Sequence, residues 1–193
     1  MRREIKGNMG PSLGLNNSRD LYKKLRHDSA RLRSDWNKYD AFNFILTAWH
    51  LHHDWHRSDP NNDISRNKRT KSGKLPQEMK LAIAVTQDIA NGSKHFILDP
   101  KPAMNRRVST THQGLESSWY SYFFHENTFG VTTNDGHYFS IRVLHNILMA
   151  YFEWVFDDNA SPRQFPTEIV SAIKYCNIAG RLPEDEMPRL WTL

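Results

Sequence analysis

The residues best suited to chemistry stand in the segment DIANGSKHF, which begins at Asp88 and ends a predicted helix. Asp88, Asn91 and His95 follow one another at intervals of three and four residues, so a helix places them on one face. His95 is a candidate proton-transfer group, and Lys94 is a candidate cation for neutralising a phosphate. Gly92 lets another backbone approach, although the same Gly-Ser step also suits a helix that ends there.

A second group of polar residues lies in the segment DAFNFILTAWHLHHDWH, which is otherwise apolar almost all round. Its polar residues recur at steps of three and four and form one stripe: Asp40, Asn43, Thr47, His50, Asp54 and Arg57. A carboxylate one turn from an imidazole, as in His50 and Asp54, fixes the tautomer and raises the basicity of the ring. The stripe either faces water or lines an internal polar site. In the second case we expect His50 or Asp54 to lie near Asn91 and His95, because buried polar groups need partners.

The histidines of this segment also raise the question of a metal. His52 and His56 have the i, i+4 spacing of a helical zinc pair. The segment has no HExxH glutamate, however, and its histidines spread around the helix instead of converging. We therefore predict no metal and no cofactor, and a metal-dependent hydrolase ranks third among the functions considered.

A basic loop follows, in the segment RNKRTKSGK. It carries five cations and no acid: Arg66, Lys68, Arg69, Lys71 and Lys74. It would suit a nucleic-acid backbone together with nearby arginines, although a loop of this kind can also be solvated without a ligand. These arginines are Arg26, Arg31, Arg33, Arg106 and Arg107. The aromatic residues between Trp119 and Phe124 either stack on bases or fill an interface between sheet and helices.

Asn91-x-x-x-His95 at a helix end, together with TAWHLHHDWH and QDIANGSKHF, resembles the HEPN superfamily and a bacterial and phage group of the same helical type. The resemblance covers about residues 40–157. It implies a helical bundle that dimerises and pairs two motifs in one metal-independent site for RNA cleavage, with Asn91 as the polar motif residue and His95 as the motif histidine. It also implies a setting in bacterial defence or toxin–antitoxin systems. The motif arginine has no counterpart at positions 88–90, so a degenerate relative that does not cleave is the other form of this prediction.

Helical periodicity predicts the elements that position these residues. Helices are expected over residues 18–34 with Ser18 as N-cap, over 40–58 with Asp35 or Asp40 as cap, over 76–95, over 141–157 and over 167–178. Residues 119–125, 128–133 and 137–139 predict short strands, and Asn134-Asp135-Gly136 predicts a tight turn. The fold class is therefore mainly α, a bundle of four to five helices with a small antiparallel β-insertion around residues 106–140. Residues 1–17 predict a flexible arm before a single domain spanning 18–193.

Composition sets the broad class. The 193 residues are 38% hydrophobic and 12% aromatic, which is enough for one core and excludes disorder throughout. The one cysteine, Cys176, excludes a scaffold of intrachain disulfides and favours a reducing compartment. No apolar run approaches the ~18 residues of a membrane span, so we expect a cytoplasmic protein without a membrane partner. The net charge of +5 favours a polyanionic partner such as nucleic acid.

The preferred function is an RNA-targeting protein, either a metal-independent ribonuclease or a degenerate form of one. The main alternative is a non-catalytic protein that dimerises and binds a nucleic acid or another protein. For the ribonuclease, the candidate catalytic residues are His95, Asn91, Lys94, Asp88, His50 and Asp54. RNA cleavage separates the first function from the second, and metal content separates both from the hydrolase.

Overall fold

The computed structural model describes residues 13–55, 71, 74–94, 107–113, 129–178 and 188–192. Helices are α1 (Ser18–Ser34), α2 (Lys38–His50), α5 (Gln77–Lys94), α8 (Ile141–Phe156), α9 (Thr167–Tyr175) and α10 (Arg189–Thr192). A π-helical turn, η1 (Leu51–Trp55), continues α2. The strands are β1 (Val108–Gln113), β2 (Phe129–Thr133) and β3 (Tyr138–Ser140). The predicted fold class, mainly α with a small antiparallel sheet, is confirmed.

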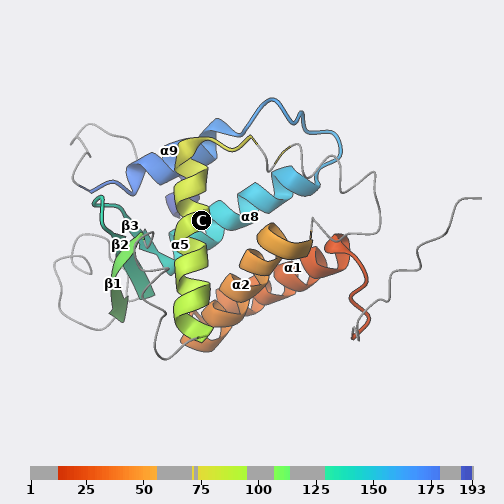
Figure 1. Ribbon diagram of the computed structural model, residues 1–193, viewed down its shortest axis with the longest axis horizontal. Helices are drawn as coiled ribbons and strands as arrows, with labels where there is room; N and C mark the ends of the chain where they lie inside the picture. The colour runs from red at the N-terminus through yellow and green to blue at the C-terminus, as the bar shows by residue number, and fades with distance from the viewer. Residues whose placement is uncertain are drawn as a thin grey trace, which may run out of the picture.

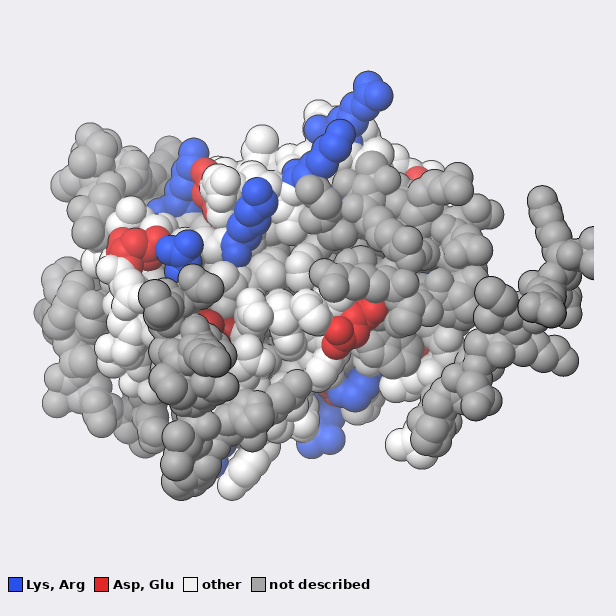
Figure 2. All heavy atoms as spheres, in the orientation of Figure 1, with Lys and Arg blue, Asp and Glu red and all other residues white. Residues whose placement is uncertain are grey.

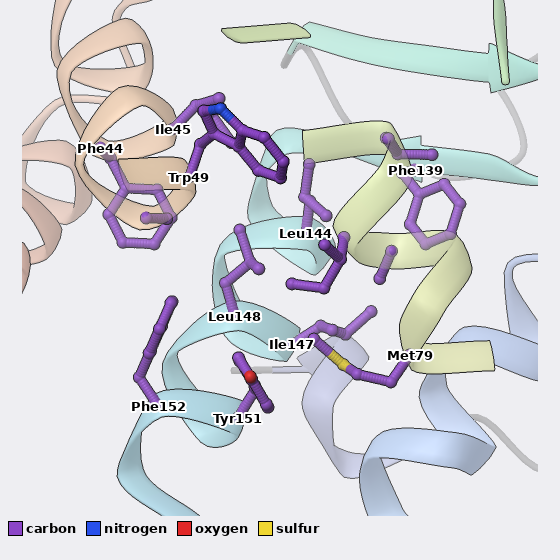
Figure 3. Packing of buried hydrophobic residues seen from close by; sticks show 14 of the residues in the cluster. Phe44, Ile45, Trp49, Met79, Phe139, Leu144, Ile147, Leu148, Tyr151 and Phe152 are labelled. Atoms are coloured by element: carbon purple, nitrogen blue, oxygen red, sulfur yellow. The ribbon is translucent and has the colours of Figure 1, made fainter. Parts of the chain in front are cut away.

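Helix α8 forms the centre of the bundle. Twelve of its sixteen residues are buried, and it contacts α1, α2, α9 and α10. In Figure 1 it runs through the middle of the molecule, with α1 and α2 on one side and α9 on the other. Figure 3 shows Leu144, Leu148 and Phe152 of α8 turned toward Phe44 of α2, while Ile147 lies beside Met79 of α5. A helix that is apolar around most of its circumference can bury its apolar surface only in such a central position.

The sheet lies at one end of the bundle (Figure 1). Its strand order is β1-β2-β3, and both pairs are antiparallel. The turn at Gly136 joins β2 to β3, and its φ of 83° is in the left-handed region that favours glycine. Ser140 ends β3 and also begins α8, because its Oγ accepts a hydrogen bond from the backbone N–H of Val143. Strand β3 therefore leads directly into the central helix.

The helix starts differ from the predicted caps. Asn17, not Ser18, caps α1 by accepting a hydrogen bond from the N–H of Asp20. Asn37, not Asp35 or Asp40, caps α2 and accepts from the N–H groups of Tyr39 and Asp40. In both cases the asparagine stands one residue before the helix, where its side chain reaches the unpaired N–H groups of the first turn.

Other predicted segments differ or lie outside the described residues. Strand β1 was not predicted as a strand, and α9 ends at Tyr175 instead of residue 178. The predicted strand at 119–125 and residues 1–12 of the predicted arm are outside the described residues. Within the described ranges no helix combines the length and apolar character that a membrane span requires.

Candidate functional site

Helix α1 carries a row of exposed cations along its outer side. We call this row, made of Arg19, Lys23, Arg26 and Arg33, the α1 stripe. Steps of four, three and seven residues keep these side chains within about 80° of one another around the helix, at 100° per residue. Lys23 is 76% exposed and Arg19 is 40% exposed. Arg33 lies fourteen residues after Arg19, so the stripe extends for about 21 Å along the helix.

The stripe is only partly neutralised. Arg19 forms an ion pair with Asp158 at 2.5 Å, and Lys23 pairs with Asp20 at 3.1 Å. Arg26 and Arg33 are exposed and form no ion pair with any residue that the structure describes. On the face shown in Figure 2, Lys and Arg side chains stand in small groups among acidic and uncharged residues.

Two acids of this region, Asp28 and Asp40, point inward, whereas Asp20 and Asp158 pair with stripe cations. Asp28 of α1 is 9% exposed and accepts hydrogen bonds from Lys24 Nζ at 2.5 Å and Thr47 Oγ1 at 2.7 Å. Asp40 of α2 is 11% exposed and pairs with Arg31 at 3.0 Å. These contacts hold α1 against α2. They also keep both carboxylates away from the outer face, which leaves that face positive.

The polar stripe of α2 is divided between two environments. Asp40 and Thr47 are buried and face α1, whereas Asn43 and Asp54 are exposed and His50 is half-buried. The N-terminal half of α2 lies near the end of α5, since Ala41 and Gly92 line one cleft. His50 stands nine residues after Ala41, about 13 Å along the helix. Because His95 is outside the described residues, the expectation that His50 or Asp54 approaches Asn91 and His95 stays a prediction.

His50 and Asp54 do form a local cluster. His50 Nδ1 lies 3.0 Å from Asp54 Oδ2, and His53 Nδ1 lies 2.6 Å from Asp54 Oδ1. Burial raises the pKa of Asp54, but the hydrogen bonds from the two histidines outweigh it and leave this pKa below its usual value. His52 instead contacts the hydroxyl of Tyr151 at 3.0 Å, and His56 is outside the described residues. Among described residues no group of three metal-ligating side chains converges.

At the end of α5, Asp88 has a structural partner. Its Oδ2 accepts hydrogen bonds from the N–H groups of Arg107 at 2.6 Å and Val108 at 3.0 Å. The carboxylate thereby anchors the start of β1. Asn91 is half-buried in the same last turns of the helix. The side chain of Lys94 and all of His95 lie outside the described part, so the predicted acid–base role of His95 stays a prediction.

The predicted basic loop contains one residue in an unexpected position. Lys71 is buried, and its Nζ donates to the backbone carbonyls of Trp154 at 2.7 Å and Asp157 at 2.6 Å. Burial lowers the pKa of Lys71. Its ammonium group binds the C-terminal end of α8, where carbonyls lack helical partners. Lys71 is thus not a surface cation, whereas Lys74 is exposed. Arg66, Lys68 and Arg69 lie outside the described residues.

A cleft of ≈ 570 Å³ opens between the sheet, the start of α2 and the end of α5. Its lining is mainly apolar and includes Phe42, Ile45, Ile89 and Leu144. Its polar lining comes from Lys38, Asp88 and the hydroxyl-rich strand β1, which forms the edge of the described sheet. The volume falls within the range of small-molecule sites, roughly 300–1,000 Å³.

A buried hydrogen-bonded chain that the sequence did not indicate joins Ser29, His145 and Asn146. Asn146 Nδ2 donates to the Leu190 carbonyl at 2.8 Å, so its Oδ1 faces His145 Nδ1 at 2.9 Å as an acceptor. Nδ1 must then carry the proton, and Nε2 accepts from Ser29 Oγ at 2.8 Å. The sequence does place a polar pair, His145 and Asn146, within an otherwise apolar helix, and this pair could have indicated the chain.

The order of this chain is that of a nucleophile, a base and an orienting group. Burial lowers the pKa of His145 to about 4, against the opposing hydrogen bond with Asn146 and with a further lowering from nearby Arg33. A base this weak takes little of a serine proton at neutral pH. All three side chains are also buried. We therefore assign the chain a structural role, in which it ties α1, α8 and α10 together.

No family model, curated protein or solved structure matches this sequence or fold. The site must therefore be judged from its own geometry. Three features remain for function: the α1 stripe, the cleft beside the end of α5, and the exposed cluster of His50, His53 and Asp54. The first is positively charged, the second is large enough for a small group, and the third is not a group that could hold a metal ion.

Proposed function

We propose that this protein binds RNA and that the α1 stripe is its phosphate-binding surface. One observation carries the proposal: four cations occupy one outer face of a well-packed helix while its buried acid, Asp28, faces α2. Each strand of a duplex carries one phosphate per about 3.4 Å of helix axis, so a stripe of about 21 Å spans several phosphates. RNA is chosen over other polyanions because of the resemblance to RNA-targeting helical proteins.

A membrane surface is a poorer partner for the same helix. An amphipathic helix that binds a bilayer must insert its apolar face between lipids. The apolar face of α1 is already occupied, because Leu21, Leu25 and Leu32 are 5%, 0% and 0% exposed in the core. Only the charged face remains available, which suits a soluble polyanion.

The test compares two triple variants that change the net charge equally. Lys23→Gln, Arg26→Gln and Arg33→Gln together remove most of the α1 stripe. Lys80→Gln, Arg163→Gln and Lys174→Gln remove three exposed cations elsewhere: Lys80 on α5, Arg163 before α9 and Lys174 on α9. Binding of a fluorescently labelled single-stranded RNA is measured by anisotropy at fixed salt.

We expect the stripe variant to weaken binding by roughly tenfold, since exposed ion pairs contribute about 0.2–1 kcal/mol each. The control variant should retain wild-type affinity within about twofold. Equal weakening in both variants would show that net charge alone drives binding, and would refute the assignment to α1. Undetectable binding by the wild-type chain would refute the function itself and favour a protein partner.

Cleavage is a separate outcome of the same experiment. Bound RNA is followed on a denaturing gel with and without a chelator. The resemblance predicts that any cleavage persists under chelation and is lost in His95→Ala. Intact RNA would favour the degenerate, non-cleaving form of the proposal, and zinc-dependent cleavage would favour the hydrolase.

A further inference from the structure

The cleft beside the end of α5 has the composition of a site for a flat, partly polar group. Its floor comes from the apolar side chains of α2, α5 and α8, and one wall comes from β1. At ≈ 570 Å³ it is large enough for one small organic group. Sequence-specific RNA binding commonly places an unstacked base against an aromatic side chain and hydrogen-bonds its edge.

Helix α2 brings a cation and an aromatic ring to this cleft. Lys38 and Phe42 are one turn apart, so they share a face, and both line the cleft. Phe42 is 38% exposed, whereas Phe44 and Trp49 of the same helix are 0% and 8% exposed. Tyr39, on the same turn, is 71% exposed and is not part of the cleft lining.

Asp88 contributes a hydrogen-bond acceptor to the lining of the cleft. Its Oδ2 is occupied by two backbone N–H groups at the start of β1, whereas its Oδ1 has no hydrogen bond with a described residue. A carboxylate oxygen accepts N–H groups and repels phosphate. Among nucleotides, adenine, cytosine and guanine carry exocyclic amines, and uracil does not.

Lys38, which lines the cleft, follows the end of the α1 stripe by five residues. The α1 stripe ends at Arg33, and α2 begins at Lys38 after a short turn. Arg31 and Asp40 link the two helices at this point with an ion pair of 3.0 Å. Arg142, beside the cleft residue Ile141, lies with its guanidinium 4.9 Å from the ring of Trp36. Among the lining residues, Lys38 carries the positive charge and Asp88 the negative charge.

We propose that this cleft receives one unstacked base of single-stranded RNA, with a preference for bases that carry an exocyclic amine. The inference rests on the proposed RNA binding and adds a substrate class to it. Phe42 stacks on the base, Lys38 pairs with a neighbouring phosphate, and Asp88 accepts from the amine. The chain therefore distinguishes single strands from duplexes, whose bases are already stacked and paired.

The experiment compares Phe42→Ala with Tyr39→Ala, its neighbour outside the cleft. Each is titrated with labelled oligo(A), oligo(U) and a duplex RNA of the same length at one salt concentration. We expect Phe42→Ala to weaken oligo(A) binding by about tenfold, as loss of one base–aromatic stack does, and to leave duplex binding unchanged. Tyr39→Ala removes a ring outside the cleft, 5.2 Å from Lys38 Nζ, and should change the binding of all three RNAs by less than about twofold. Circular dichroism confirms that both variants fold.

A second variant tests the amine preference. Asp88→Asn keeps an oxygen for the two N–H groups of β1 but adds an amide donor, so the ratio of oligo(A) to oligo(U) affinity should fall. Equal effects of Phe42→Ala and Tyr39→Ala, or an unchanged ratio in Asp88→Asn, would overturn the base-binding cleft while leaving RNA binding by the α1 stripe intact. Absence of wild-type binding to every RNA would instead refute the proposed function on which the cleft depends.

Discussion

Acidification should destabilise this protein through one buried histidine, His145. The ring is 3% exposed and lies against Phe44 at 4.7 Å and Trp36 at 5.4 Å between ring centres. Burial lowers its pKa from 6.5 to about 4, the hydrogen bond with Asn146 opposes this shift, and the positive charge of Arg33 adds to it. Arg33 is the charged group that acts on the ring, and its effect also favours the neutral form.

The sign follows from comparing the folded and unfolded chains. Below pH 6.5 the unfolded chain binds a proton at this ring, whereas the folded chain leaves it neutral until about pH 4. Stability therefore falls as the pH decreases through this window. This difference in pKa between the unfolded and folded chains corresponds to about 3 kcal/mol of unfolding free energy, at roughly 1.4 kcal/mol per pKa unit. This loss is a large part of the free energy of unfolding of a typical domain, which is roughly 5–15 kcal/mol.

Urea unfolding at several pH values between 7.5 and 4.5 measures this loss. The comparison is with His145→Gln, which keeps a donor and an acceptor but does not titrate, and with His27→Gln, a substitution at a histidine that is 70% exposed on α1. The unfolding free energy of wild type should fall more steeply with acidification than that of His145→Gln, by up to about 3 kcal/mol. Parallel curves for these two proteins would refute the reasoning.

Two substitutions test packing. Lys71→Met leaves two carbonyls at the end of α8 without their buried donor and should lower the free energy of unfolding in urea by about 2 kcal/mol. The control Lys74→Met should stay within about 0.5 kcal/mol of the wild type. An unchanged free energy of unfolding in Lys71→Met would contradict the assigned contact. Gly130→Ala would place its Cβ 2.5 Å from the hydroxyl oxygen of buried Tyr138 and should cost about 1–3 kcal/mol. Gly92→Ala has no neighbour within 4 Å and should not lower the melting temperature, so equal melting of the two alanine variants would contradict this packing.

The long helices were predictable because their signal is local. Leu144, Ile147, Leu148 and Tyr151 recur at helical spacing, and the same residues are 0–1% exposed in α8. The caps were not assigned correctly because several residues that suit a cap stand close together before α2. The difference between Asn37 and Asp40 depends on backbone geometry at the helix start, which the pattern of residue types does not contain.

Other features depend on contacts between distant parts of the chain. Strand β1 has the sequence VSTTHQ, which lacks apolar alternation, and it forms by pairing with β2. Lys71 sits in a run of cations that reads as solvated, yet it binds α8, 83 residues away. Asp40 and Thr47 belong to one polar stripe of α2 in the sequence, yet both are buried against α1, where they contact Arg31 and Asp28. Tertiary packing, not local preference, decides these positions.

The salt dependence of RNA binding tests the central claim most directly. Each phosphate contact on a single strand contributes about 0.7 to the slope of log K against log salt concentration. Removing Lys23, Arg26 and Arg33 should therefore reduce the slope by about 2, while the control variant of Lys80, Arg163 and Lys174 keeps the wild-type slope. A stripe variant with the full wild-type slope would contradict the assignment of α1 as the phosphate-binding surface.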